Sequence, residues 1–250
     1  MIPRRPKGYA GQEGIVMVNL PSLREMLDAG VHFGHKTSRW HPKMESYIFM
    51  SKNGVSVINL EKTEEELKKA VDYVRDLAAS GKTIIFVGSK KQAGEIVKKA
   101  AINCGMPYIN VRWVGGTLTN FETIKVAIKK FKTQKEELEA SNAKLSKKEL
   151  SKLREVVEKG EKLFGGLSGL EKKPDALILL GVHDERNALR EANLENIPVI
   201  GMVDTNMDPT NVAYPIPAND DATKSIELFA NLFSRVIKEN KGLAKAQEQK

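Results

Sequence analysis

Short apolar runs alternate with longer amphipathic segments through most of the chain. Four of these runs predict strands: TIIFVGS (83–89), YINVRW (108–113), DALILLG (175–181) and PVIGMVD (198–204). The segments between them, including QAGEIVKKAAINCG (92–105) and RNALREANLEN (186–196), predict helices. Apolar strands separated by helices are typical of a parallel sheet that is covered on both faces. We therefore expect an α/β fold with a doubly wound, mostly parallel sheet of the flavodoxin or Rossmann type.

The N-terminal part of the chain has a different pattern. SLREMLDAG (22–30) predicts a helix, with Ser22 as its cap and Gly30 as its stop. SYIFMSKNGVSVINL (46–60) predicts two short strands joined at its Asn-Gly pair, which is a strong hairpin signal. The intervening residues 31–44 predict a loop. We expect this helix, loop and hairpin to precede the alternating part of the fold.

Two further helices have recognisable N-terminal signals. Thr63 and Glu66 have the spacing of a capping box, which predicts a helix that runs to about Ala79. DATKSIELFANLFSRVIKEN (221–240) predicts a long final helix that is capped near Asp220. Both helices are amphipathic, so we expect them to cover the sheet.

Residues 120–165 interrupt the alternation of strands and helices. Apolar residues follow heptad a and d spacing on the first arm, with Lys135 as a polar interruption: Phe121, Ile124, Ile128, Phe131 and Leu138. After SNAKL (141–145), Ser146 and Glu149 form a second capping-box pattern. Heptad spacing then continues, with Gly160 at the remaining position: Leu150, Leu153, Val157 and Phe164. This pattern predicts a protruding antiparallel coiled-coil hairpin.

The domain organisation follows from these patterns. Residues 17–119 and 166–240 are expected to form one α/β domain, and 120–165 the hairpin, while 1–16 and 241–250 are expected to be a flexible arm and tail. The single cysteine and the lack of a long apolar run indicate a cytoplasmic protein without a membrane segment.

The net charge of +8 is unevenly distributed. Residues 82–132 hold ten Lys or Arg against two Glu, whereas residues 165–237 hold six basic against eleven acidic side chains. A basic region with an acidic counterpart favours polyanion binding on one side of the molecule. The alternative interpretation is a solubilised surface with lysines scattered over its helices.

Basic and aromatic residues occur together in two places. Arg39, Trp40 and Lys43 share one predicted loop, and Arg112 and Trp113 end a predicted strand. Such residues grip phosphates and stack on exposed bases of folded RNA, although each tryptophan can instead belong to the core, which we favour for both. The candidate RNA-binding residues are Arg39, Lys43, Lys90, Lys91, Arg112, Lys129 and Lys130.

Two loops precede helices where a phosphate-binding loop would lie. VGSKKQAGE (87–95) follows a strand but fits neither of the two common glycine-rich phosphate patterns. It leaves open an α/β enzyme that binds a phosphorylated small molecule. The second, RWVGGTLTN (112–120), is either a phosphate loop or a hinge from which the hairpin leaves the domain.

Catalytic and metal-binding signals are weak. HFGH (32–35) holds two of the four histidines, and the others are His41 and His183. No second His or Cys pair completes a zinc pattern, so we interpret His32 and His35 as packing or hydrogen-bonding residues. No hydrolase or metalloprotease motif is present. We expect no catalytic activity, no cofactor and no bound metal.

Three aspartates follow predicted strands or precede a helix on one edge of the sheet. Asp204 closes the strand at 198–204, and Asp220 and Asp221 lie at the start of the final helix. We expect the three carboxylates to converge and to form a binding site for a partner protein. The alternatives are helix capping by Asp220 or Asp221 and a divalent ion that the partner's ligands complete.

Several long blocks resemble one family, the bacterial ribosomal protein S-two family of the small subunit. They occur in order between about residues 17 and 239: LREMLDAGVHFGHKTSRWHPKM (23–44), VGSKKQA (87–93), RWVGGTLTNFETI (112–124), PDALILL (174–180), EANLENIPVIGMVDTNMDP (191–209) and YPIPANDDATKSIEL (214–228). The segment around His183 and Asp184 differs from the sequence that is usual in the family, so the resemblance implies no role for these two residues.

The resemblance implies a doubly wound α/β domain with a coiled-coil hairpin and a structural role in the small ribosomal subunit. It implies that the glycine pair in 112–120 is the hinge of the hairpin. The implied partners are small-subunit ribosomal RNA and neighbouring ribosomal proteins, including the S-one protein. No enzymatic activity is implied.

Overall fold

The computed structural model of the chain describes residues 18–140 and 146–247. Its central sheet has five parallel strands in the order β5-β4-β6-β7-β8. Their bounds are β4 Ile84–Val87, β5 Tyr108–Ile109, β6 Ala176–Leu179, β7 Val199–Val203 and β8 Tyr214–Pro217. Numbered within this sheet, the order is 2-1-3-4-5, which is the flavodoxin-like doubly wound order. The expected fold class is confirmed.

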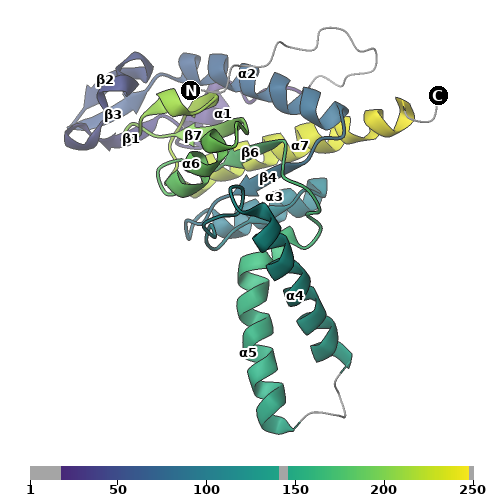
Figure 1. Cartoon of the computed structure of the whole chain (residues 1–250). Coiled ribbons are helices and arrows are strands. Elements are labelled where there is room, and N and C mark those ends of the chain that lie inside the picture. Colours follow the sequence, from purple (N-terminus) through teal and green to yellow (C-terminus); the bar gives the residue numbers. More distant parts are fainter. Residues whose placement is uncertain (1–17, 141–145, 248–250) are drawn as a thin grey trace.

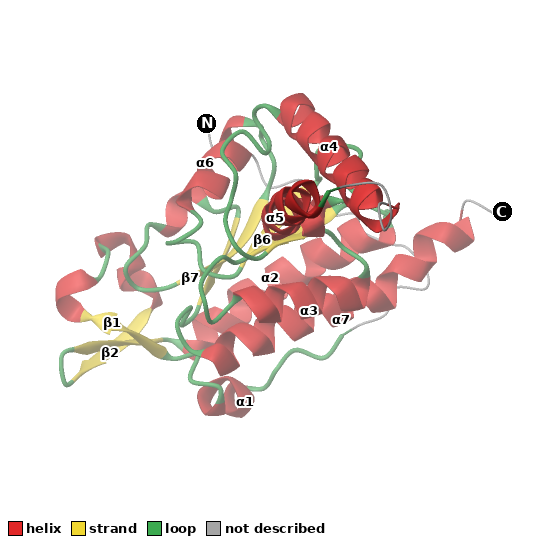
Figure 2. Cartoon of the chain, turned by 90° about the horizontal axis from the view of Figure 1, so that it is seen from below, coloured by secondary structure: helices red, strands yellow, loops and turns green. Residues whose placement is uncertain are grey.

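Helices cover both faces of this sheet, which explains why its strands are apolar at every position (Figure 2). Ile84 and Phe86 of β4 face α2 (Leu60–Ala79), α3 (Gly94–Cys104) and α7 (Thr223–Gln247). The alternate residues, Ile85 and Val87, face α6 (Arg186–Leu194) and the base of α4 (Phe121–Ala140). Each face therefore has its own hydrophobic core.

The edge strand β8 was not predicted from the sequence. Its residues read YPIP, and proline lacks the N–H that a strand needs for pairing on both sides. Tyr214 and Ile216 pair with Ile200 and Met202 of β7. An edge position accommodates prolines because only one side of the strand is paired.

A second, three-stranded antiparallel sheet has the order β1-β3-β2 (Figure 1). Its strands are β1 Phe33–Lys36, β2 Ile48–Lys52 and β3 Val55–Ile58. The predicted turn is confirmed, since Asn53 and Gly54 both have positive φ, 54° and 74°. Strand β1 lies where a loop was predicted, because FGHK has no apolar alternation that marks a strand.

Two of the four predicted helix caps are confirmed. Helix α1 (Leu23–Asp28) begins at a capping box of Ser22 and Glu25, and α5 (Lys147–Phe164) begins at one of Ser146 and Glu149. The short 3₁₀ helices are η1 Thr37–Arg39, η2 Pro42–Tyr47, η3 Gly165–Leu167 and η4 Pro209–Asn211.

The capping box at Thr63 was wrong. The N-cap of helix α2 lies four residues earlier, at Asn59, whose side chain accepts hydrogen bonds from the N–H groups of Glu61 and Lys62. The buried Thr63 hydroxyl instead bonds to the carbonyls of Asn59 and Pro217.

Capping of the last helix by an aspartate was also wrong. The Asn219 side chain accepts from the N–H groups of Asp221 and Ala222 just before α7 begins. The helix continues to Gln247 instead of ending at residue 240, because Ala, Lys, Leu and Gln after that point favour helix. The expected arm, residues 1–16, and residues 248–250 of the expected tail lie outside the described residues.

Helices α4 and α5 form a hairpin that projects from the sheet domain (Figure 1). The Phe131 ring packs at Gly160, where any side chain would collide with it, and Lys135 forms an ion pair with Glu161 at 3.0 Å. Regular coiled-coil packing stays a prediction, and the SNAKL connection lies outside the described residues.

The base of the hairpin belongs to the sheet domain. Phe121, Ile124 and Ile128 are buried in the same core cluster as strand residues of β4 and β6. The apolar seam is therefore buried partly against the sheet domain and not only between the two arms. Among the described residues, no helix is long and apolar enough to cross a membrane.

Candidate functional site

Charged side chains gather where four parallel strands end. Lys90 follows β4, Asp184 follows β6, Asp204 follows β7 and Asp220 follows β8. Parallel strands present their carboxyl ends at one edge, where doubly wound sheets bind ligands. We name this group, together with Asp221 and His35, the carboxyl-edge cluster.

Lys90 is the centre of the carboxyl-edge cluster. Its Nζ lies 2.7 Å from Asp220 Oδ1, 2.9 Å from Asp221 Oδ1 and 3.1 Å from Asp184 Oδ2. Burial opposes its charge, but hydrogen bonds to these carboxylates raise the pKa of Lys90 above its usual value. The ammonium is engaged by carboxylates within the protein, which disfavours an RNA phosphate as its partner, and the RNA contact of Lys90 stays a prediction.

Asp220 is almost completely buried, with 1% of its side chain exposed. Burial raises the pKa of Asp220 to about 6, against the opposing effect of the Lys90 charge. Its Oδ2 has no hydrogen-bond partner among the described residues. In Asp221, burial is outweighed by the hydrogen bond and charge of Lys90, which lower the pKa. The pKa values of the two neighbouring carboxyl groups are therefore shifted in opposite directions.

His35 joins the cluster from β1. Its Nδ1 lies 3.0 Å from Asp204 Oδ1 and its Nε2 lies 3.4 Å from Asp221 Oδ2. The hydrogen bond to Asp204 raises the pKa of His35, although burial opposes this. The sequence interpretation of His35 as a packing or hydrogen-bonding residue agrees with these contacts. Its partners could not be named, because no sequence signal showed that β1 lies beside the end of β7.

Three members of the cluster have the geometry of metal ligands. One ligand atom from each of His35, Asp204 and Asp221 lies within 4.8 Å of the others. One imidazole and two carboxylates suit a zinc-type ion, and three protein ligands leave a position for a ligand from elsewhere. The cluster also borders a cavity of about 470 Å³, which Arg39 and His183 help to line.

The loop at 87–95 is filled by internal carboxylates. The N–H of Ser89 donates to Glu185 Oε1 at 2.6 Å, and Lys90 faces the aspartates. Burial raises the pKa of Glu185, which is 2% exposed. An incoming phosphate would meet these acidic groups, so the geometry does not favour a phosphorylated ligand here.

The remaining predicted RNA-binding residues divide into two groups. Lys43 pairs with Asp208 at 2.7 Å, and although burial opposes it, this pairing lowers the pKa of Asp208 to about 2. The other five are exposed and form no ion pair with any described residue: Arg39, Lys91, Arg112, Lys129 and Lys130. We name these five the exposed basic set.

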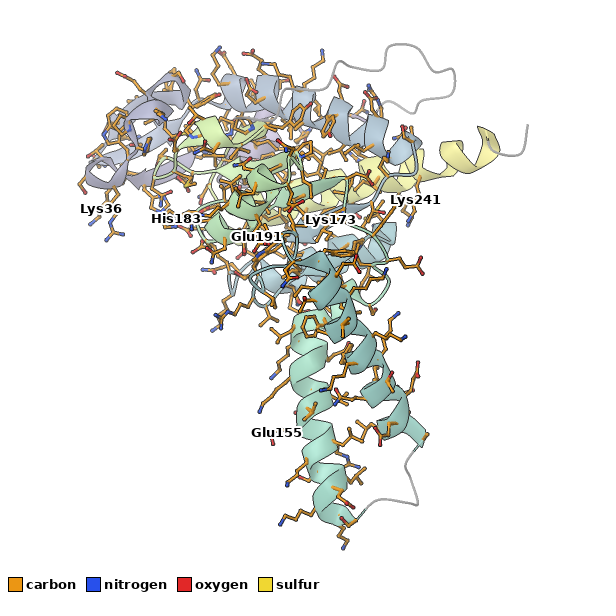
Figure 3. All side chains as sticks on the ribbon, viewed as in Figure 1. Lys36, Glu155, Lys173, His183, Glu191 and Lys241 are labelled. Carbon is orange, nitrogen blue, oxygen red and sulfur yellow. The ribbon has the colours of Figure 1, made fainter. Side chains whose placement is uncertain are left out.

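The glycine loop at 112–120 is also organised by an internal anion. Glu191 of α6 accepts a hydrogen bond from the indole Nε1 of buried Trp113 at 2.9 Å and from the N–H of Gly116 at 2.8 Å. Gly116 has a φ of 88°, which favours glycine. Figure 3 shows Glu191 where the hairpin meets the sheet domain. A core position is confirmed for Trp113 but was wrong for Trp40, which is 38% exposed.

Large apolar side chains lie exposed on the three-stranded sheet beside His35. Phe33 is 54% exposed, Phe49 69% and Met50 47%. Large apolar side chains that lie exposed on a monomer are candidates for a protein contact. We name these three residues the apolar patch.

A family comparison agrees with the resemblance of the sequence blocks. The model of the family described as Ribosomal protein S2 matches residues 26–240. The match spans most of the chain, from α1 to α7, and includes both sheets, the carboxyl-edge cluster and the described part of the hairpin. The chain therefore belongs to the ribosomal protein S2 family, whose members are structural constituents of the ribosome.

Proposed function

We propose that the protein is a non-enzymatic constituent of the small ribosomal subunit in the cytoplasm and binds ribosomal RNA through the exposed basic set. The observation that carries this proposal is the contrast among the basic residues. Lys43 and Lys90 are neutralised by aspartates, whereas the exposed basic set has no ion-pair partner among the described residues. Unpaired cationic side chains are free to contact phosphates.

A cavity at the base of the hairpin also supports RNA binding, because lysine side chains line it. It has a volume of about 720 Å³ and lies at the amino end of the sheet, away from the carboxyl-edge cluster. Its lining includes Lys82, Lys125, Lys172 and Lys241, of which Lys82 pairs with Asp175 (Figure 3 labels Lys241). Positive charge around a concave surface attracts a polyanion.

Co-sedimentation tests this function. Tagged protein in a cell lysate is expected to sediment with the small subunit in a sucrose gradient. The competing hypothesis, an α/β enzyme that uses residues 87–95, predicts stabilisation by nucleotides or sugar phosphates in a thermal-shift screen. Saturable binding of such a ligand, together with no ribosome association, would overturn the proposal.

For the carboxyl-edge cluster, the proposed ligand is a neighbouring ribosomal protein, with the S-one protein as the expected partner. Exposed Asp221 would meet the partner, with the buried Asp204 and Asp220 behind it, and the apolar patch would supply buried area. A divalent ion held by His35 and two carboxylates would be completed by a ligand of the partner.

A double variant separates docking from folding. In Asp204→Asn/Asp221→Asn, asparagine keeps the side-chain size, so subunit incorporation is expected to continue while S-one retention falls. Asp72→Asn on the exposed surface of α2 is the matched control. Unchanged S-one retention in the double variant would remove the cluster from the interface, and loss of incorporation would show a structural role instead.

A further inference from the structure

Glu191 makes an unusual number of hydrogen bonds for one buried carboxylate. It is 8% exposed, and all the groups that donate hydrogen bonds to it among the described residues belong to the segment directly before α4. Oε1 accepts from Trp113 Nε1 and Gly116 N, and Oε2 accepts from Leu118 N at 3.0 Å, Thr119 N at 3.2 Å and Thr119 Oγ1 at 3.2 Å. The carboxylate thus lies within a concave group of donors.

This donor group has the chemistry of an anion-binding loop. Successive backbone N–H groups converge at a glycine turn that opens a helix, which is how proteins bind phosphate. Here the anion comes from α6 of the same chain. Burial alone would raise the pKa of Glu191, but the hydrogen bonds from Trp113 and the loop lower it, which agrees with a bound carboxylate.

Because the loop lies directly before α4, a small change at Glu191 can change the direction of the whole hairpin. Helix α4 begins at Phe121, two residues after Thr119, and has 20 residues. At about 1.5 Å per residue it is roughly 30 Å long, so a change of about 10° at its base moves its far end by roughly 5 Å. Apolar burial of the base is non-directional, whereas hydrogen bonds depend on angle.

We propose that Glu191 is the built-in anion of this loop and fixes the direction in which the hairpin leaves the sheet domain. It is a positioning residue, since it acts on the hairpin through the segment 113–119. The inference stands independently of RNA binding, because it concerns the isolated protein.

Distance measurements between two spin labels test the proposal. The labels are placed at Lys68→Cys on α2 and Lys148→Cys on α5, both exposed, in a Cys104→Ala background. Glu191→Gln keeps the shape of the side chain but turns an amide N–H₂ toward N–H donors. We expect the most probable distance to shift by several ångströms, roughly 5 Å for a 10° change, or the distribution to broaden at least twofold.

Chemical rescue separates charge from packing. Glu191→Ala removes the carboxylate and is expected to broaden the distribution as well, and added acetate should restore it by entering the vacated donor group. Acetamide, which has nearly the same size but no charge, should not. The control Glu195→Gln makes the same chemical change four residues later, at the surface ion pair with Lys173, and should leave the distances unchanged.

Either of two results would overturn the proposal. One is a wild-type distance distribution in Glu191→Gln, which would show that packing alone orients the hairpin. The other is equal rescue of Glu191→Ala by acetate and acetamide, which would show that the carboxylate only fills space. Should Glu191→Ala fail to fold, the Gln variant alone still decides the question.

Discussion

Lys90 and Asp220 form a buried ion pair, with Nζ and Oδ1 2.7 Å apart, between two strands that are far apart in the sequence. Lys90 follows β4 and Asp220 follows β8, and these two strands are separated in the sheet by β6 and β7. The pair therefore ties together the ends of strands that do not contact each other directly. Its lysine is 16% exposed and its aspartate 1%.

Removal of the lysine charge should destabilise the protein. In Lys90→Met the acidic groups of the cluster lose their counter-ion, and breaking a buried pair costs about 3–5 kcal/mol. The folded-state pKa of Asp220 is already raised, to about 6, so the folded state gains protons relative to the unfolded chain as the pH falls. The variant should therefore regain stability from pH 7 to pH 5.

Urea unfolding at several pH values measures this effect. The matched control is Lys91→Met, one residue along and exposed, which should change stability by less than about 0.5 kcal/mol. An equal loss in both variants at pH 7 would contradict the role of Lys90 as the counter-ion of the cluster.

The histidines should titrate in a defined order. Burial lowers the pKa of His32 and His183, whereas the hydrogen bond to Asp204 raises that of His35 above its ordinary 6.5. The stabilising contribution of protonated His35 is thus fully present below about 6.5 and is lost as the pH rises through its higher folded-state pKa. NMR titration of the imidazole resonances should show His35 losing its proton at higher pH than His32 and His183.

A variant identifies the cause of the His35 shift. In Asp204→Asn the pKa of His35 should fall, because the main acceptor loses its charge. The resonances of His32 serve as the internal control, because burial and not Asp204 lowers the pKa of His32. An unchanged His35 titration would assign the shift to other groups.

RNA affinity should depend on salt through the exposed basic set. Replacement of all five residues by Gln should lower the slope of log affinity against log salt by roughly 3.5 to 4.5, since each phosphate contact contributes about 0.7–0.9. The measurement is filter binding to small-subunit ribosomal RNA at several salt concentrations. The control replaces five exposed lysines elsewhere: Lys52, Lys68, Lys99, Lys224 and Lys238. Equal slopes for the two variants would show a general charge effect.

The hairpin should be removable only in part. Replacement of residues 120–165 by a Gly-Ser link removes Phe121, Ile124 and Ile128 from the core, at about 2–5 kcal/mol each. That total is comparable with the whole stability of a typical domain, about 5–15 kcal/mol, so cooperative unfolding should be lost.

A shorter deletion provides the control for this result. Replacement of residues 134–156 keeps the core side chains and the contact between Phe131 and Gly160. This variant should unfold cooperatively in calorimetry. Cooperative unfolding of both variants would show that the base of the hairpin is dispensable. Loss of cooperative unfolding in both would show that the core includes residues of the outer hairpin.

The sequence predicted what depends on local pattern. The apolar runs of β4, β6 and β7 are buried on both faces, so every residue carries the signal. The Asn53-Gly54 turn was readable because both residues favour positive φ. By contrast, β1 and β8 depend on their neighbours, since one has no alternation and the other holds two prolines.

Long-range charge pairing was beyond the sequence. Lys90 read as a surface cation at a helix start, and only the fold brings three aspartates around it. Glu191 read as one acidic residue of an amphipathic helix, and nothing in its spacing pointed to the loop at 113–119. The sequence resemblance implied that the glycine pair in 112–120 is the hinge of the hairpin. The structure adds that the Glu191 carboxylate binds the loop that contains this pair.

The prolines of β8 also affect how a free copy of this protein behaves before assembly. Every second residue of this segment, Tyr214, Ile216 and Ala218, turns its backbone N–H toward β7, and the Ala218 N–H donates to the Val203 carbonyl. Pro215 and Pro217 therefore turn their nitrogens outward, where they offer no N–H, and the Pro217 carbonyl already accepts the Thr63 hydroxyl. Another chain cannot extend the sheet at these positions, which protects this edge from intermolecular strand addition and aggregation.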